Sequence, residues 1–160
     1  NMEYSFGKNS AKKLKTCHVD LQKIWNLAIS RSVLDIGISE GHRPISVQQA
    51  YYAIGRTTEL NRKPITKVDG VNKIGKHNVE PSLASDFFVY HKIKQTRIKI
   101  AYDKAHLSYV YGLLDSCAKE LYEKGSISHL LRWGANWDGD GVLFFDQSFD
   151  DAPHVELVKP

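Results

Sequence analysis

A long amphipathic helix in the second half of the chain sets the strongest limit on its fold. Asp103 is placed to cap the first turn of this helix, and Gly125 stands where glycine commonly follows a helix end. Between them one apolar stripe runs through Leu107, Val110, Tyr111, Leu114, Cys117, Ala118, Leu121 and Tyr122. Such a stripe must pack against other elements, so we interpret it as core and not as a cofactor site.

The rest of the pattern predicts shorter helices and strands. Apolar residues three and four apart predict a helix that is capped by Ser10 and reaches Ala28, and they allow a break near residues 18–20. A second short helix is expected at Ser46–Ile54, ended by Gly55. Strands are expected at 33–39, 83–90, 130–133 and 154–158, with a glycine- and aspartate-rich turn at 134–141.

A basic stretch, Lys92–Ile100, is expected to form a hairpin strand with lysine, glutamine, threonine and arginine at its exposed positions. One interpretation of such a strand is a nucleic-acid-binding ribbon. The more common one is an exposed strand edge that lysines protect from pairing with another sheet, so no nucleic-acid partner is expected. The net charge of +4 favours an anionic partner without choosing its kind.

Length and composition predict one soluble domain over residues 1–160, large enough to bury a core without disulfides. Cys17 and Cys117 fall on apolar helix faces, which indicates buried reduced thiols. No apolar run approaches the roughly 20 residues that span a bilayer. The N-terminal part of the sequence also lacks the unbroken apolar centre of a signal peptide. We expect no membrane insertion and no export by the general secretory route.

Two parts of the chain are expected to shape a site. Residues 56–82 show no sustained period and contain Pro64, Gly70, Gly75 and Pro81. Irregular segments of this length are uncommon in compact domains unless they are functional. Arg43 follows the first expected strand in a turn, where a side chain is held firmly and faces solvent or a cleft. An ordinary surface arginine is the alternative.

Two histidines and one aspartate supply the donor set of a catalytic zinc site. His77 lies in the irregular segment nine residues before Asp86, and His154 begins the last expected strand. Catalytic zinc takes three histidine or carboxylate ligands and leaves a fourth position for water. Spacing alone does not single out this set, because two histidines and an aspartate this far apart occur in many unrelated chains.

Several short motifs in a fixed order give these residues a context. They are Gly41-His42-Arg43-Pro44, Gln48 with Gly55-Arg56-Thr57, Lys76-His77-Asn78, Pro81 to Asp86, Arg132 to Gly141 and Asp151 to Leu157. At these residues the chain resembles the zinc peptidases of the D-alanyl-D-alanine carboxypeptidase and L-alanyl-D-glutamate endopeptidase family, especially its phage endolysins. The resemblance covers most of the chain. It implies an α+β, hedgehog/D-Ala-D-Ala peptidase-like single domain, in which a small antiparallel sheet packs with helices.

The resemblance also implies a role for each matching residue. His77, Asp86 and His154 match the ligands of one zinc ion, and Asp151 matches a catalytic acidic residue three positions before the last ligand. A carboxylate beside the metal can take a proton from the attacking water and hand it to the leaving amine. Arg43 matches a cleft arginine, suited to stabilising the developing oxyanion or to holding a substrate carboxylate. The neighbouring Asp150 competes for the role of base, but it lacks the family spacing.

Other residues are candidates for supporting the site. Trp133 and Trp137 are expected to form cleft walls that contact substrate, with a place in the core as the alternative. Glu156 follows His154 by two, so on a strand both face the same side and Glu156 is a candidate for orienting that ligand. A plain structural glutamate is equally open. Gly75 stands where many family members carry a serine that holds a substrate carboxylate, which weakens any transfer of strict carboxypeptidase specificity.

The turn after the third expected strand resembles half of a calcium loop. Asn136, Asp138 and Asp140, followed by Gly141, place oxygen donors at alternate positions. The bidentate glutamate of the twelfth position is replaced by Gln147. A calcium site and a tight turn are both open, and we prefer the turn.

The resemblance thus implies a zinc metallopeptidase, an endolysin that hydrolyses the stem peptide of bacterial peptidoglycan at the L-alanyl-D-glutamate bond. A D-alanyl-D-alanine carboxypeptidase and a non-catalytic wall-binding module of the same fold are the alternatives. Peptidoglycan is the expected partner, since a basic protein suits an anionic wall. We expect a monomer that is made in the host bacterial cytoplasm and is released to the cell wall without a signal peptide.

Overall fold

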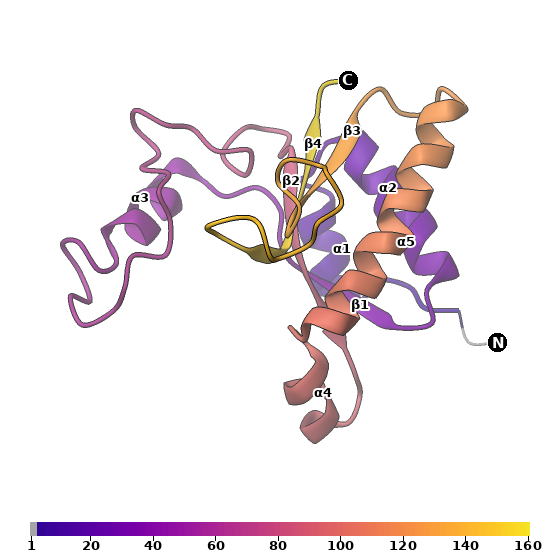
Figure 1. Cartoon of the computed structure of the whole chain (residues 1–160), viewed down its shortest axis with the longest axis horizontal. Helices are drawn as coiled ribbons and strands as arrows, with labels where there is room; N and C mark the ends of the chain where they lie inside the picture. The colour runs from indigo at the N-terminus through magenta and orange to yellow at the C-terminus, as the bar shows by residue number, and fades with distance from the viewer. Residues whose placement is uncertain (1–2) are drawn as a thin grey trace.

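Four strands form one antiparallel sheet in the middle of the structure, a computed structural model that describes residues 3–160 (Figure 1). The strands are β1 (Asp35–Glu40), β2 (Ala84–Tyr90), β3 (Leu130–Gly134) and β4 (Asp151–Val158), and they lie in the order β1-β2-β4-β3. The predicted α+β fold with a small antiparallel sheet is therefore confirmed. The predicted domain range begins with two residues that lie outside the described part, and it stays a prediction.

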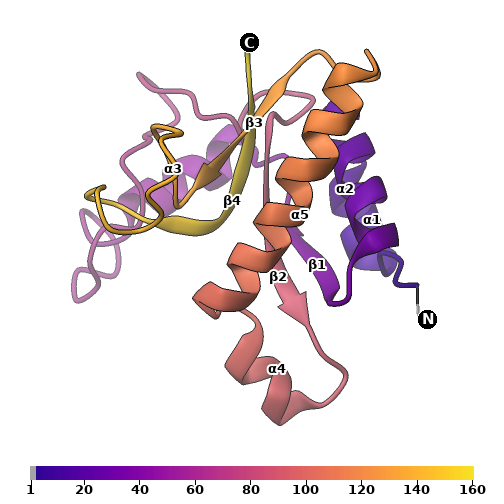
Figure 2. The same cartoon turned by 45° about the vertical axis from the view of Figure 1, so that its right-hand side comes forward.

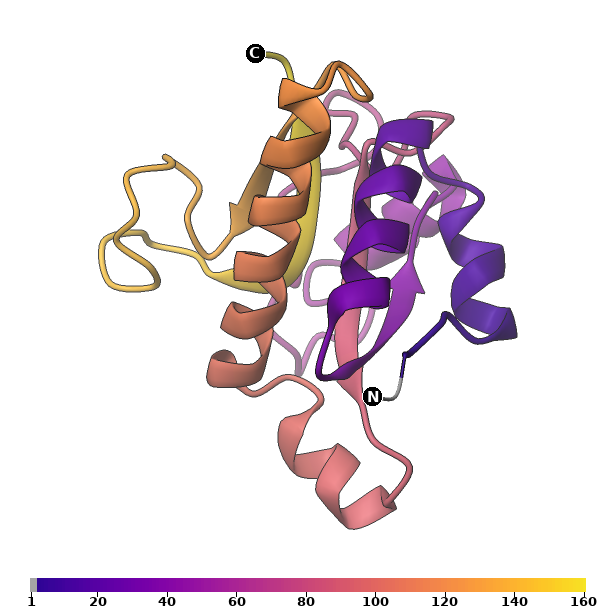
Figure 3. The same ribbon diagram turned by 90° about the vertical axis from the view of Figure 1, so that its right-hand side faces the viewer.

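Three helices cover one face of the sheet and complete the core. They are α1 (Lys8–Leu14), α2 (Val19–Arg31) and α5 (Lys104–Glu123). In Figure 3, α2 and α5 lie side by side in front of the strands. Most of the predicted stripe of α5 is buried between Leu107 and Ala118, Tyr111 is half-buried, and Tyr122 near the helix end is exposed. As predicted, the Asp103 side chain caps α5, and Gly125 follows the helix with a positive φ.

The prediction for the N-terminal helix is partly wrong. The chain does break after α1, and His18 is the N-cap of α2. Ser10, however, lies inside α1, whose N-cap is Gly7. The Ser10 hydroxyl accepts a hydrogen bond from the Ile38 N–H at 3.0 Å. Because its side chain bonds to β1, Ser10 fastens α1 to the sheet instead of capping a helix.

The expected hairpin strand at Lys92–Ile100 is wrong, because this segment forms α4 (Lys94–Ile100). β4 pairs with only Ala84–Asp86 of β2. Beside the rest of β2, the Val89 N–H donates to the Ala101 backbone oxygen at 3.0 Å, so the end of α4 takes the place of a further strand. Lysine, glutamine and arginine are also good helix formers. α4 projects from one end of the sheet (Figure 2), and the Arg97 guanidinium packs 5.2 Å from the centre of the Tyr90 ring.

The opposite face of the sheet carries α3 (Ile45–Ala53) and the irregular segment. Figure 1 shows both on the side away from α2 and α5. As predicted, residues 54–83 contain only isolated bridges and turns. Alternation along the strands sends Phe87 and Val155 into the core, and it sends Asp86 and His154 to this face. Side chains that carry chemistry are therefore gathered between the sheet and the irregular segment.

Both cysteines are buried free thiols, as predicted. Burial raises the pKa of the Cys17 thiol to about 11, so this side chain stays protonated at neutral pH. Among residues 3–160, no helix combines the length and the apolar character needed to cross a bilayer.

Candidate metal centre and cleft

The pairing of β2 with β4 places two of the predicted ligands side by side. Asp86 lies directly opposite His154 in the register of the two strands. Side chains in such positions have Cβ atoms about 4.5–5.5 Å apart, so both can reach one point. The adjacent Phe87 and Val155 are fully buried in the core, which holds both strands in this orientation.

The irregular segment supplies His77 as the third member. Its Nδ1 lies 2.8 Å from the Gly41 backbone oxygen, so the ring donates a hydrogen bond there and directs Nε2 towards the sheet. The Arg43 N–H donates in turn to the His77 backbone oxygen at 2.7 Å. Two hydrogen bonds therefore fasten this part of the segment to the turn that follows β1.

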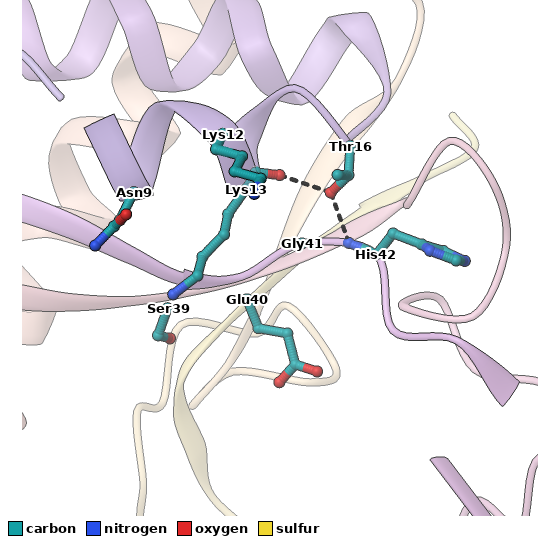
Figure 4. Close-up of a pocket in the computed structure, with 8 residues that line it drawn as sticks. All are labelled: Asn9, Lys12, Lys13, Thr16, Ser39, Glu40, Gly41 and His42. Carbon is teal, nitrogen blue, oxygen red and sulfur yellow. Dashed lines mark hydrogen bonds between the residues drawn. The ribbon is translucent and has the colours of Figure 1, made fainter. Parts of the chain in front are cut away.

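Gly41 is held by a close approach to the end of α1. In the hollow beside this turn (Figure 4), the Thr16 hydroxyl donates to the Lys13 backbone oxygen at 2.6 Å and accepts from the His42 N–H at 2.8 Å. A Cβ on Gly41 would collide with the Thr16 hydroxyl and the Lys13 oxygen. Packing against this turn thus positions the carbonyl group that orients His77.

The three donor atoms form an equilateral triangle. His77 Nε2, Asp86 Oδ1 and His154 Nδ1 each lie 3.2 Å from the other two. Two ligands of a tetrahedral zinc ion, at bond lengths of about 2.1 Å, lie about 3.4 Å apart. The triangle therefore fits three corners of such a tetrahedron, and the structure brings together the residues that the sequence suggested as ligands.

Hydrogen bonds on the outer ring nitrogens orient both imidazoles. His154 Nε2 donates to Glu156 Oε1 at 2.8 Å, and Arg132 donates to the other oxygen of that carboxylate at 2.7 Å. His77 uses its Nδ1 in the same way on Gly41. Each ring can then keep a lone pair on the nitrogen nearest Asp86, as metal-binding histidines require. Glu156 thus occupies the position of a residue that orients a ligand.

Charges in the triangle are strongly coupled. Burial lowers the pKa of His154, but hydrogen bonds with Asp86 and Glu156 outweigh this effect and raise it to about 9. Burial raises the pKa of Asp86, but hydrogen bonds from His154 and His77 lower it overall. Without an ion, His154 therefore holds a proton that balances the carboxylates. A divalent cation would take the place of that proton, so binding of the ion releases it.

A cleft of about 970 Å³ opens in front of the triangle, and Arg43 lines it. The Arg43 guanidinium donates to both oxygens of Glu40 and, at 2.8 Å, to Gln48. It also lies 3.7 Å from Asp86 Oδ2. Arg43 is therefore a fixed cation at the edge of the triangle, and the alternative of a free surface arginine is wrong.

The sequence did not single out the two residues that fix Arg43. The register of β1 shifts between Ile38 and Glu40, and this bulge turns Glu40 to the cleft instead of the core. Gln48 is only 2% exposed within α3. Its presence in one of the motifs that carry the family resemblance was the available signal.

Arg132 is a further cleft residue without a predicted role. Its Nε is buried and finds no hydrogen-bond partner among residues 3–160. A buried donor without a partner costs about 1–3 kcal/mol. The guanidinium itself is held between the Glu156 carboxylate and the Trp137 ring, whose centre lies 5.8 Å away.

Asp151 begins β4 at the edge of the cleft. Its strand partner is Gly134, where a Cβ would collide with the Asp151 backbone oxygen. Burial raises the pKa of the Asp151 carboxyl, and the nearby charge of His154 lowers it less than burial raises it. Asp150 is exposed and accepts a hydrogen bond from Gln147 at 2.8 Å. Of the two aspartates, Asp151 has the position of a base beside the triangle.

The two tryptophans lie in different environments. Trp137 lines the cleft, with its ring centre 5.6 Å from that of His154. Trp133 is fully buried, and its ring stacks on Tyr111 at a centre-to-centre distance of 4.6 Å. The expectation that Trp133 forms a cleft wall is therefore wrong. Successive side chains of β3 point to opposite faces of the sheet. Arg132 faces the cleft, and the next residue, Trp133, therefore faces the helices.

Acidic side chains gather in the loop that follows β3. Asp138, Asp140 and Asp146 place carboxylate oxygens within 4.8 Å of one another. Burial, followed by the hydrogen bond and charge of Asp140, raises the pKa of Asp146. Asn136 and Gln147 instead make hydrogen bonds within the loop itself. The structure thus adds Asp146 to the group that the sequence pattern suggested.

Comparison with known proteins finds a family model, a relative and a solved structure that this chain resembles. A model of the family described as phage L-alanyl-D-glutamate peptidase matches residues 2–158. The L-alanyl-D-glutamate peptidase of Escherichia phage T5 is 28% identical over 159 residues, which cover 98% of this chain and 100% of that protein. The crystal structure of the Serratia marcescens L-Ala D-Glu endopeptidase ChiX matches with a TM-score of 0.67 and 18% identity, over 98% of this chain and 91% of that one. At this identity, the match to ChiX shows the fold alone.

Proposed function

The chain belongs to the phage L-alanyl-D-glutamate peptidase family, endolysin-type hydrolases of peptidoglycan, and we propose that it works with one zinc ion held by His77, Asp86 and His154. The observation that carries this proposal is the triangle of donor atoms, each 3.2 Å from the other two. Two imidazoles with one carboxylate suit zinc, whereas calcium and magnesium prefer oxygen ligands alone.

The proposed mechanism gives Asp151 the proton transfers. A zinc ion held by His77, Asp86 and His154 would supply a charge that polarises the scissile carbonyl and would allow water to act as a nucleophile at neutral pH. The Asp151 carboxylate takes a proton from the attacking water and passes it to the leaving amine of D-glutamate. The raised pKa of this carboxyl group suits a residue that must accept a proton and then release it.

The two cleft arginines suit an anionic stem peptide. Negative charge develops on the carbonyl oxygen during attack, and a guanidinium that is already fixed stabilises this charge without reorganising. Arg43, held by Glu40 and Gln48, has this property. The Arg132 side chain is 41% exposed, so its outer N–H groups are available for a carboxylate on the D-glutamate side of the bond. Trp137 provides an apolar wall of the same cleft.

The scissile bond is tested by digesting a defined muropeptide with the zinc-loaded protein and measuring fragment masses. We expect a fragment that ends in L-alanine and a second one with a new amino terminus at D-glutamate. Release of free D-alanine would instead indicate a carboxypeptidase. Binding to purified peptidoglycan without new amino termini would indicate a wall-binding module and would contradict the proposal.

We also propose that calcium orders the loop through Asp138 and Asp140, together with Asn136 or Asp146. Clustered carboxylates repel one another, and the cation would offset this repulsion. At calcium concentrations a hundredfold above Kd, we expect the melting temperature to rise by about 5–10 °C. Activity should rise with it, because Trp137 in this loop lines the cleft.

The calcium prediction is checked with zinc held constant, by adding calcium to protein that has been treated with a chelator. Asp138→Asn combined with Asp140→Asn should abolish the response and leave the zinc content unchanged. Asp115→Asn combined with Glu123→Gln removes the same charge from α5, outside the loop, and serves as the matched control. An unchanged melting temperature and activity in the unmodified chain would leave the loop as a tight turn.

We propose further that the protein acts as a monomer and is made in the host cytoplasm before it acts on the cell wall. All residues assigned to the cleft come from one chain, so the site needs no second copy. The net charge of +4 suits the anionic wall. Sedimentation of the purified protein and fractionation of infected cells test these two points.

A further inference from the structure

A second group of two histidines and one carboxylate lies where α2 begins, beside the connection from α5 to β3. His18 is the N-cap of α2, Asp20 lies in its first turn, and His129 directly precedes β3. One donor atom from each of the three side chains lies within 4.8 Å of the donors from the other two. None of the three lines the cleft that holds His77. The group therefore has no part in the site described above.

Asp20 is the fixed centre of this group. Its side chain is only 6% exposed, and its Oδ2 lies 2.7 Å from His129 Nδ1 and 3.0 Å from the Ser128 N–H. Its other oxygen, Oδ1, accepts no hydrogen bond from any residue in the range 3–160 and lies 3.9 Å from His18 Nδ1. A carboxylate that is anchored through one oxygen presents the other as a preorganised ligand.

The two imidazoles close the group on its solvent side. Their side chains are 27% and 21% exposed, and the rings meet edge to face with centres 4.8 Å apart. His18 Nδ1 accepts a hydrogen bond from the Asp20 N–H at 3.0 Å, so this nitrogen carries a lone pair and not a proton. An ion can enter from solvent, and water can complete its coordination.

We propose that His18, Asp20 and His129 form a second site for a divalent transition ion of the zinc class. Two donors of one tetrahedral ion lie about 3.4 Å apart, so the 3.9 Å pair must close by about 0.5 Å and the 2.7 Å pair must open by about 0.7 Å. Rotation of the half-exposed rings brings the third pair together. The ion takes the place of the proton on His129 Nδ1, which moves to Nε2 of the same ring by exchange with solvent so that the imidazole stays neutral, and the ion takes the His18 lone pair from the Asp20 N–H. It ties the start of α2 to the segment before β3.

Counting bound ions tests this proposal. Chelator-treated chain is dialysed against zinc buffered in the micromolar range, and zinc per chain is measured by atomic emission. We expect two ions for the unmodified chain and one for the double variant His18→Asn, His129→Asn. Asparagine at position 18 keeps an acceptor for the Asp20 N–H, and asparagine at position 129 keeps a donor for the Asp20 carboxylate. The fold should therefore survive the loss of the ligands.

Two further double variants show which side chains hold each ion. The pair His77→Asn and His154→Gln empties the cleft site, and the remaining ion should raise the melting temperature only while His18 and His129 are present. The control is His91→Asn with His106→Asn. His91 Nδ1 accepts a hydrogen bond from the Ile93 N–H at 3.1 Å, and His106 Nδ1 lies 2.6 Å from Asp103 Oδ2. The control therefore replaces two histidines that make hydrogen bonds of the same kinds but lie outside the group. This control should keep both ions.

The results separate this inference from the proposed function. One ion per unmodified chain, lost on changing His77 and His154, would overturn the second site and leave the cleft site intact. A second ion that persists in the His18→Asn, His129→Asn variant would also overturn the assignment to these residues. One ion that is lost only in that variant would instead support the second site and contradict the zinc proposed for the cleft.

Discussion

Asp151→Asn is expected to keep stoichiometric zinc and the native fold while kcat falls by about 10²- to 10⁴-fold, the usual contribution of a general base. An amide has nearly the same shape as the carboxylate, but it cannot accept the proton of the attacking water. Asp151 is the strand partner of Gly134 and reaches the cleft with a carboxyl group whose pKa burial has raised. KM should change little, because the substituted group acts on the proton and not on substrate binding.

The matched control for this prediction is Asp150→Asn, which makes the same change one residue earlier. Asp150 is exposed and hydrogen-bonded to Gln147, so its loss should leave kcat within about twofold. The measurement is the rate of fragment release from a defined muropeptide, with zinc content and melting temperature recorded for each protein. Near-normal turnover in Asp151→Asn, or a collapse of turnover in Asp150→Asn alone, would show that the base is not Asp151.

His77→Asn and His154→Gln should each lose the cleft ion and reduce kcat/KM by more than about a thousandfold. The metal supplies several kcal/mol of transition-state stabilisation, and each 1.36 kcal/mol corresponds to about tenfold in rate. Asparagine places its amide near the position of the His77 Nδ1, so the bond to Gly41 can persist while Nε2 is removed. Glutamine likewise places its amide near Nε2 of His154 and can still donate to Glu156.

Asparagine at position 77 and glutamine at position 154 are chosen so that the variants still fold and can be measured. Alanine at position 154 would leave Asp86 and Glu156 as buried carboxylates without their shared partner, which costs about 3–5 kcal/mol in comparable cases. His106→Asn, in an exposed pair with Asp103, is the control and should leave zinc and kcat/KM unchanged. Full zinc occupancy of the cleft in either His77→Asn or His154→Gln would contradict the ligand assignment.

Local patterns in the sequence predicted the elements whose packing they determine. The stripe of α5 was visible because every third or fourth residue is apolar, and its caps at Asp103 and Gly125 follow from backbone chemistry. The candidate ligands could be found for a different reason: histidine and aspartate are among the few side chains that bind zinc, and the motifs around them resemble one family. Neither argument needed knowledge of distant contacts.

Features that depend on the arrangement of the whole sheet were not predictable in this way. Within Lys92–Ile100 the chain forms α4, and Ala101 at its end accepts a hydrogen bond from the Val89 N–H of β2, a contact that no local pattern reveals. Trp133 was expected in the cleft but lies in the core, whereas Arg132 lines the cleft without having been expected there. Side chains alternate along β3, and which of them enter the core depends on the face of the sheet that the helices cover. The bulge before Glu40 likewise turns this carboxylate to the cleft, where it accepts hydrogen bonds from Arg43.

Whether His77, Asp86 and His154 share one ion is decided by anomalous diffraction from a crystal grown with zinc, recorded on both sides of the zinc absorption edge. We expect a peak about 2.1 Å from each of the three donor atoms. The peak should vanish in crystals of the His77→Asn variant. A crystal of fully active protein with no zinc among these three side chains would contradict the metal-dependent mechanism.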